Sequence, residues 1–93
     1  MNIAQLDFVC RQSTRNAFDE FKRQIEFAMF PFDEDLKTTL QRQMLEQLRQ
    51  GVVKTIFKEN KLGKSDCRVL TDTLNQYGLL ALKVSNNYSK KYL

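Results

Sequence analysis

Residues 52–58, VVKTIFK, decide which fold class the sequence predicts. Their β-branched and aromatic side chains favour a strand, and the alternation places Val53, Thr55 and Phe57 on one face. A polar turn follows, and residues 67–74, CRVLTDTL, alternate again. The two segments therefore predict an antiparallel β-hairpin whose loop is longer than the minimal type.

The sequence beyond the hairpin is short. Residues 79–84, LLALKV, follow Gly78 and are typical of a third strand, although the periodicity also allows a short helix. Residues 86–93 are polar and basic, and we expect a loosely held tail there. The predicted β part thus covers residues 51–85.

The sequence before the β part has helical periodicity. Apolar residues recur at steps of three and four from Leu6 to Ala28, which predicts an amphipathic helix of about 20 residues or more. The polar pair Ser13 and Thr14 allows a kink or a split into two shorter helices. Pro31 ends the helix, because proline cannot continue the hydrogen-bond ladder.

A second helix is predicted to begin after Asp33. This aspartate is a good N-cap, and two further carboxylates follow it in the first turn, where the helix dipole is positive. Gly51 is expected to be the C-cap. The apolar stripe between them steps by four through Leu36, Leu40, Met44 and Leu48.

These segments predict one α+β domain over residues 1–93. A helical hairpin occupies residues 1–50, a small antiparallel β-hairpin or three-stranded sheet occupies residues 51–85, and the basic tail follows at 86–93. The length of 93 residues suits a single small domain. A hydrophobic content of 42% and a charged content of 28% are ordinary for a globular protein and unlike a disordered one.

The composition gives no support for an enzyme. The chain has no His, which removes the commonest metal ligand and the usual general base near neutral pH. Its three Gly form no phosphate-binding loop. Helix capping explains the acidic run at residues 33–35 better than a metal site does. We therefore expect no catalytic residues, no metal and no cofactor.

The two cysteines and the hydropathy point to an intracellular setting. Cys10 and Cys67 lie far apart without a Cys-x-x-Cys pair, so we expect two reduced, partly buried thiols, with one long-loop disulfide as the alternative. No stretch approaches the roughly 20 apolar residues that span a bilayer, and the N-terminus lacks the pattern of a signal peptide. A cytoplasmic protein without membrane contact is expected.

The net charge is unevenly distributed. The chain has 15 basic and 11 acidic residues, a net charge of +4. Residues 1–46 carry a net charge of −2, and residues 47–93 carry +6. Basic side chains neutralise phosphates and tyrosine rings stack on unpaired bases, which favours RNA as a partner. The alternative is a solvated strand face whose lysines prevent edge-to-edge pairing. The predicted RNA-binding residues are Arg49, Lys54, Lys58, Lys61, Lys64, Arg68, Lys83, Tyr88, Lys90 and Lys91.

Six of the seven Phe lie in the first third of the chain. Most of them are explained by the core face of a helix. Phe27, Phe30 and Phe32 cannot all lie on one helical stripe, so this segment is the first candidate for binding a protein partner. The helical half is also the candidate for homo-oligomerisation.

The β part also contains a motif. The stretch LRQGVVKTIFK at residues 48–58, then Gly63, then RVLTDTL at residues 68–74, resembles a family of short proteins from large tailed bacteriophages with the pattern L-R-x-G-V-V-x-V-x-F, a turn, and R-V-M-x-C-T-L. Thr55 replaces an apolar residue of that pattern, Asp72 replaces the cysteine, and the turn is longer. The resemblance covers less than a third of the chain.

The resemblance implies a phage accessory protein in the cytoplasm of a bacterial host. Combined with the charge distribution, it leads to the hypothesis of a non-enzymatic RNA-binding protein that counteracts host machinery, for example an antitoxin-like inhibitor of a host defence system. The alternative is a protein-interaction module that inhibits a host enzyme or polymerase without nucleic acid. A small DNA-binding regulator ranks third, because the basic residues of the second helix are dispersed around it.

Overall fold

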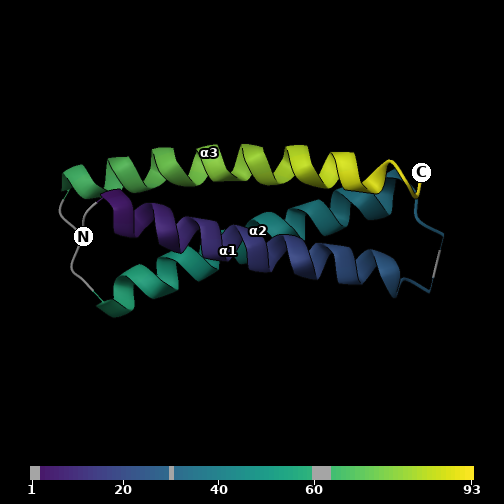
Figure 1. Ribbon diagram of the computed structural model, residues 1–93, viewed down its shortest axis with the longest axis horizontal. Coiled ribbons are helices and arrows are strands. Elements are labelled where there is room, and N and C mark those ends of the chain that lie inside the picture. The colour runs from purple at the N-terminus through teal and green to yellow at the C-terminus, as the bar shows by residue number, and fades with distance from the viewer. Residues whose placement is uncertain (1–2, 30, 60–63) are drawn as a thin grey trace.

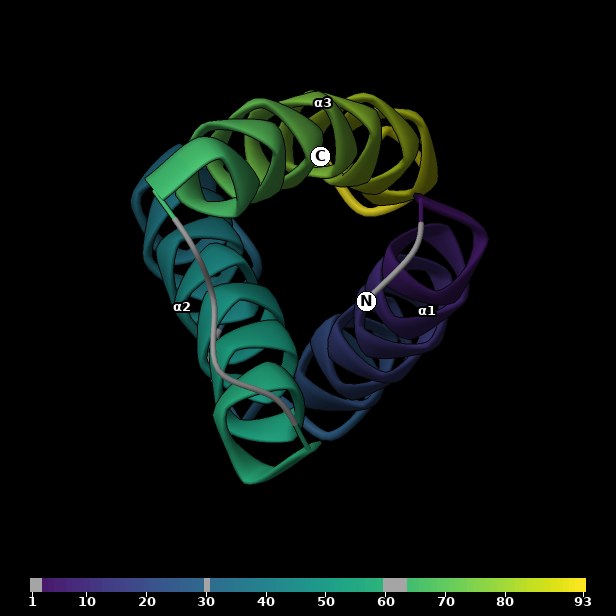
Figure 2. The same cartoon turned by 90° about the vertical axis from the view of Figure 1, so that its left-hand side faces the viewer.

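The computed structural model describes residues 3–29, 31–59 and 64–93. Over these residues it contains three helices, α1 (Ile3–Glu26), α2 (Glu34–Glu59) and α3 (Lys64–Ser89). They form an elongated bundle with extents of 45 × 20 × 18 Å, in which α1 and α3 run in one direction and α2 in the other (Figure 1). Seen along the bundle, the helices lie at the corners of a triangle (Figure 2).

The predicted α+β fold is wrong. The described residues contain no strand, and the fold is all-α. The segment 52–58 lies in the second half of α2, and the segments 67–74 and 79–84 lie in α3. Four residues of the expected tail, 86–89, form the last turn of α3. The helical part therefore extends well beyond residue 50.

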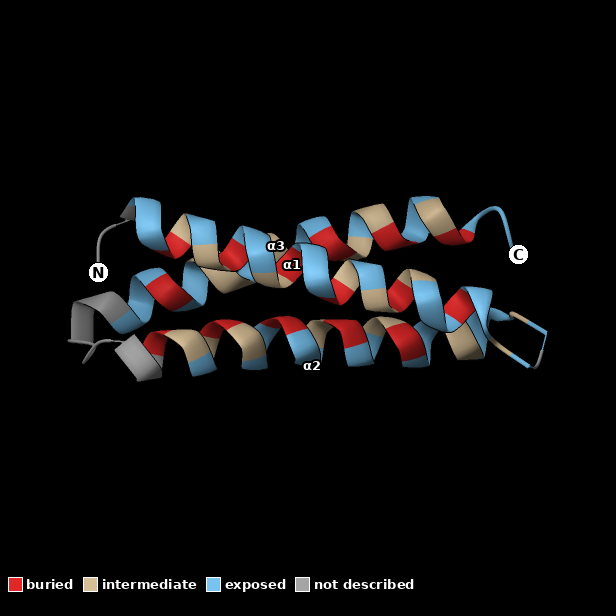
Figure 3. Cartoon of the chain, turned by 60° about the horizontal axis from the view of Figure 1, so that its bottom comes forward, coloured by how far each residue is buried: buried red, intermediate tan, exposed pale blue. Residues whose placement is uncertain are grey.

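The side chains of α2 show why the strand did not form. Leu40, Met44, Leu48, Val52 and Ile56 are all buried, and they continue one four-residue step through the whole helix. Figure 3 shows these buried positions as a band along the helix. A four-residue step is helical, so the burial of Val52 and Ile56 outweighs the β propensity of the segment.

Gly51 does not end α2 but lies inside it, without a positive φ. A Cβ added at Gly51 would lie 2.9 Å from Oγ of Ser13 on α1. That oxygen is the end of a small rotatable side chain, so turning Ser13 would relieve the contact, and α1 and α2 simply lie close together at this point. Gly51 is therefore an interior residue of α2 close to α1 and not a C-cap.

Threonine side chains explain the misleading β pattern of α3. Thr71 and Thr73 donate to the carbonyl oxygens of Cys67 and Val69 at 2.9 and 2.7 Å, each four residues back. This bond satisfies the hydroxyl within the helix and makes a β-branched residue tolerable there. The core face of α3 follows steps of three and four through Leu70, Leu74, Tyr77, Ala81, Ser85 and Tyr88.

The predictions for α1 and for the start of α2 are confirmed. Leu6, Cys10, Phe21 and Ile25 are buried, and α1 runs unbroken through Ser13 and Thr14. The buried Thr14 hydroxyl donates to the carbonyl of Cys10 at 2.7 Å. Asp33 Oδ1 accepts a hydrogen bond from the backbone N–H of Leu36 at 2.8 Å, as an N-cap does.

Two apolar clusters fill the bundle. One joins Phe21 and Ile25 of α1 to Met44 of α2 and Ala81 of α3. The other lies at the N-terminal end of α1, where the buried residues are Leu6, Cys10, Val52, Ile56 and Leu70. Full burial of a large aliphatic or aromatic side chain stabilises by about 1.5–3 kcal/mol, so both clusters contribute substantially to stability.

Polar contacts attach α3 to α2. Gln41 Nε2 donates to Ser85 Oγ at 2.9 Å and to Asn86 Oδ1 at 2.8 Å. The buried Ser89 hydroxyl donates to the carbonyl of Ser85 at 2.8 Å. Because these buried hydroxyls are hydrogen-bonded, the polar side of α3 packs against α2 without leaving either hydroxyl unsatisfied.

Substitutions at Ile56 and Val53 distinguish the helix from the strand. Ile56→Ala should lower the free energy of unfolding by about 2–5 kcal/mol, because it opens a cavity in a fully buried position. Val53→Ala should cost about 1 kcal/mol or less, because Val53 is only partly buried and Ala has the higher helix propensity. Urea unfolding followed by circular dichroism measures both. A larger cost at Val53 would contradict the helical register.

Candidate functional site

Apolar side chains gather where α1 ends, α2 begins and α3 ends, at one end of the bundle (Figure 1). Phe27 is 77% exposed and Met29 is 95% exposed. Single exposed apolar residues are common on protein surfaces, whereas a group of them at one place is typical of an interaction site. We call the following residues the aromatic end: Phe27, Met29, Phe32, Tyr92 and Leu93.

Aromatic contacts hold this end in place. The ring of Phe32 meets that of Tyr92 edge to face at a centroid distance of 6.2 Å, and Tyr92 lies 5.6 Å from Tyr88. Tyr88 in turn meets Phe18 of α1 at 5.9 Å. Offset and edge-to-face pairs of this kind are favourable. The segment before α2 is thereby tied to the ends of α1 and α3.

The hydroxyl of Tyr88 is also paired. It lies 3.2 Å from the hydroxyl of Tyr92 and donates to Glu26 Oε1 at 3.2 Å. The hydrogen bond with Tyr92 contributes most to raising the pKa of Tyr88. Desolvation by neighbouring side chains and the hydrogen bond with Glu26 raise it further. Because its ring and hydroxyl are both engaged, Tyr88 is poorly placed to stack on a nucleic-acid base.

Two of the three predicted partner-binding residues belong to the aromatic end. Phe27 is exposed and Phe32 is partly buried, whereas Phe30 lies outside the described residues. The role of these residues in partner binding stays a prediction.

The predicted RNA-binding residues do not lie on a hairpin. Arg49 and Lys54 are exposed on α2, Arg68 and Lys83 are exposed on α3, and Lys90 is exposed in the turn directly after α3. Lys91 follows α3 and lies 5.1 Å from the centre of the Tyr88 ring. Lys61 lies outside the described residues, as do the side chains of Lys58 and Lys64.

An apolar groove separates α1 from α3 on the surface of the bundle and has a volume of about 290 Å³. At its edge, Arg11 Nε lies 2.9 Å from Asp7 Oδ2 and 3.3 Å from the hydroxyl of Tyr77, which donates to Asp7 Oδ1. Partial burial and the bond to Asp7 raise the pKa of Tyr77, while the bond to Tyr77 raises that of Arg11. The groove is lined by Arg11, Thr14, Arg15, Phe18, Tyr77, Leu80 and Val84.

This groove was not predicted from the sequence. The three- and four-residue steps that place Tyr77 and Val84 beside α1 are visible in the sequence, but the strand assignment for the same region concealed them.

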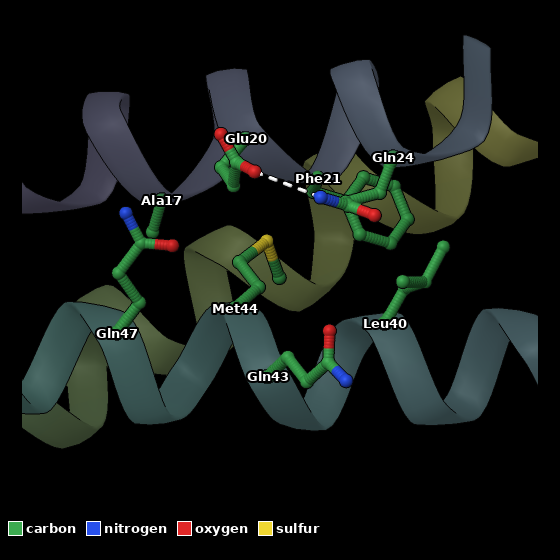
Figure 4. Close-up of a pocket in the computed structure, with 8 residues that line it drawn as sticks. All are labelled: Ala17, Glu20, Phe21, Gln24, Leu40, Gln43, Met44 and Gln47. Atoms are coloured by element: carbon green, nitrogen blue, oxygen red, sulfur yellow. Dashed lines mark hydrogen bonds between the residues drawn. The ribbon is translucent and has the colours of Figure 1, made fainter. Parts of the chain in front are cut away.

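A smaller cavity lies between α1 and α2 and has a volume of about 80 Å³ (Figure 4). Phe21, Met44 and Leu40 line its apolar side, and Gln24 Nε2 donates to Glu20 Oε1 at 2.8 Å at its rim. This space suits a few water molecules and is too small for an ordinary substrate.

Two kinds of feature are not found among the described residues: a cluster of metal-ligating side chains and a membrane-spanning helix. Those residues contain no group of three or more Cys, Asp or Glu side chains placed to hold a metal ion. None of the three helices, as far as they are described, has an apolar stretch long enough to cross a bilayer.

No protein-family model, no curated protein and no solved structure matches this chain. The resemblance to the bacteriophage family therefore stays a prediction.

The two thiols should react at very different rates. Both are free in the structure, without the disulfide considered above, and Cys10 is buried while Cys67 is exposed. Burial, with a smaller contribution from Asp7, raises the pKa of Cys10 from 9.0 to about 11. Iodoacetamide at about pH 8 should therefore modify Cys67 in the folded protein and Cys10 only after unfolding, as read by peptide mass spectrometry.

The pKa of Cys10 also sets the sign of a pH effect. Because its pKa in the fold is raised, the protonated thiol contributes stability that is present below pH 9 and decreases as the pH rises towards 11. Equal native labelling of both thiols would contradict the burial of Cys10.

Proposed function

We propose that this protein is a non-enzymatic interaction module that binds a protein partner through the aromatic end. The observation that carries the proposal is the exposure of Phe27 and Met29, at 77% and 95%, at the same end of the bundle as the paired rings of Phe32 and Tyr92. Aromatic residues and Met are enriched in protein interfaces, and each such side chain gains about 1.5–3 kcal/mol when it is fully buried.

The aromatic contacts favour binding because they order part of the surface in advance. Phe32, Tyr92 and Tyr88 hold one another, and Tyr88 packs on α1. A surface that is already ordered loses less conformational entropy when it binds. In the setting that the phage resemblance implies, the partner would be a host protein whose activity is inhibited or modified by docking.

Replacing both exposed side chains should abolish capture of the partner. Phe27→Ala with Met29→Ala should weaken binding at least tenfold, because hot-spot residues each contribute about 2 kcal/mol or more. The measurement is affinity capture from a nuclease-treated bacterial lysate, with captured proteins quantified by mass spectrometry. The control is Phe8→Ala, which removes a Phe that is 62% exposed near the other end of α1.

A partner lost on nuclease treatment, or equally weakened by Phe8→Ala, would contradict the proposal. Sedimentation of the pure protein shows whether the partner is instead a second copy of the chain.

A second candidate function is RNA binding along α3. Arg68, Lys83 and Lys90 are exposed and form no ion pair with a described residue. Arg68 and Lys83 are 15 residues apart, which places them on one side of α3 across about 22 Å of its length, and Lys90 follows the end of the helix. Such a row can follow a phosphate backbone, although the structure offers few exposed rings beside it for base stacking.

Salt dependence tests this second function. Single-stranded RNA binding, measured by fluorescence anisotropy across a salt series, should weaken at least tenfold in Lys83→Glu with Lys90→Glu. The slope of log K against log salt should fall by about 1.4, because two phosphate contacts are lost. Arg42→Glu with Lys54→Glu, on α2, is the control for the charge change. Binding that is insensitive to salt, or an equal effect of the control, would exclude this role for α3.

A further inference from the structure

The groove between α1 and α3 is a second surface, separate from the aromatic end. Arg11 and Phe18 of α1 mark its two ends on one side, and Tyr77 and Val84 of α3 mark them on the other. Each pair is seven residues apart, so the groove extends over two helical turns, or about 10 Å. This length and the volume of about 290 Å³ suit one or two large side chains better than a whole small-molecule substrate.

The groove is mainly apolar and part of it remains exposed. Leu80 is 48% exposed and lines the groove together with the partly buried Phe18 and Val84. Its neighbour Leu79 is 69% exposed but does not line the groove. The two adjacent leucines therefore provide a matched pair, one inside the groove and one outside.

The charged groups that line this groove are cationic. Arg11 forms an ion pair with Asp7 and a hydrogen bond with Tyr77. The ion pair neutralises the Asp7 carboxylate at the edge of the groove. Arg15 is exposed and forms neither an ion pair nor a hydrogen bond with any described residue. Its guanidinium can therefore accept a carboxylate from another molecule, with two parallel hydrogen bonds.

The rings beside the groove do not favour a nucleic acid. Lys22 Nζ lies 4.8 Å from the centre of the Phe18 ring, and the edge-to-face contact with Tyr88 occupies that ring further. The hydroxyl of Tyr77 is bonded to Asp7. Lys22 and Tyr88 leave less of the Phe18 ring free for stacking on a base, whereas Leu80 offers apolar area to a side chain.

We propose that this groove binds an acidic amphipathic helix of a partner protein. One Leu- or Phe-sized side chain of that helix packs between Phe18 and Leu80, and a Glu or Asp one turn away pairs with Arg15. An apolar groove two turns long between helices suits this mode, in which anchors three or four residues apart enter together. The proposal concerns a different surface from the aromatic end and does not depend on the function proposed there.

The probe is a fluorescein-labelled model helix with two Leu four residues apart, flanked by Glu. One companion peptide carries Lys in place of Glu, and the other carries Ser in place of Leu. The whole chain should bind the Leu and Glu peptide at least tenfold more tightly than either companion in fluorescence anisotropy. In ¹⁵N-labelled protein, the amide shifts should centre on Arg15, Leu80 and Val84.

Matched variants locate the binding site. Arg15→Glu and Leu80→Gln should each weaken the Leu and Glu peptide at least tenfold, because one removes the cation and the other the apolar contact. Arg42→Glu, an exposed position on α2, and Leu79→Gln should leave the affinity within about twofold. All four positions are exposed, so circular dichroism should show folded variants.

Several outcomes would overturn the proposal. The first is that the peptide does not bind, and the second is that the two control variants lose as much affinity as the groove variants. The third is loss of peptide binding in Phe27→Ala, which would move the site to the aromatic end. If single-stranded RNA displaces the peptide, and RNA binding is lost in Arg15→Glu, the groove is a polyanion site instead. Apart from the Phe27→Ala result, these outcomes leave open whether the aromatic end captures its own partner.

Discussion

The continuity of α2 through Gly51 is the constraint on which the rest of the structure depends. Because the helix does not end there, Val52 and Ile56 reach Leu6 and Cys10 and form the second apolar cluster. Without those residues the N-terminal half of α1 would have no apolar cover from α2. At Gly51 the backbone of α2 also comes close to the Ser13 side chain of α1.

The third helix converts this pair into a bundle with distinct surfaces. Hydrogen bonds from Gln41 attach α3 to α2, while Tyr77 and Tyr88 attach it to Asp7 and Glu26 of α1. These contacts use the polar parts of α3 and leave Leu80 in the groove. The same arrangement brings Tyr92 to Phe32, which assembles the aromatic end. Both proposed binding surfaces therefore follow from where α3 lies.

Local patterns in the sequence predicted the first half of the fold well. The stripe of α1 and the Asp33 cap are correct, because each depends on residues within one or two helical turns. The β part was predicted from Val53, Thr55 and Thr71, whose branched side chains favour strands when considered alone. In the fold the Thr55 hydroxyl bonds the carbonyl of Gly51 at 2.8 Å, and the burial of Ile56 decides in favour of the helix.

The candidate site was predicted only in part, for a similar reason. Phe27 and Phe32 could be singled out because, together with Phe30, they cannot all lie on one helical stripe. The predicted basic hairpin does not form, because the described residues contain no strand. Its described residues are distributed over α2 and α3. The groove could not be predicted, because it is lined by residues from two helices, such as Arg15 and Leu80, that are 65 residues apart in the chain.

The sequence by itself determined the start of α2, the amphipathic face of α1, the excess of positive charge and the absence of His. These are properties of single residues or of neighbours along the chain. Only the tertiary structure decided that residues 52–58 are helical and that Gly51 lies inside α2. Burial against another helix contributes more free energy than intrinsic propensity does, and that burial is not visible in any local stretch of the sequence.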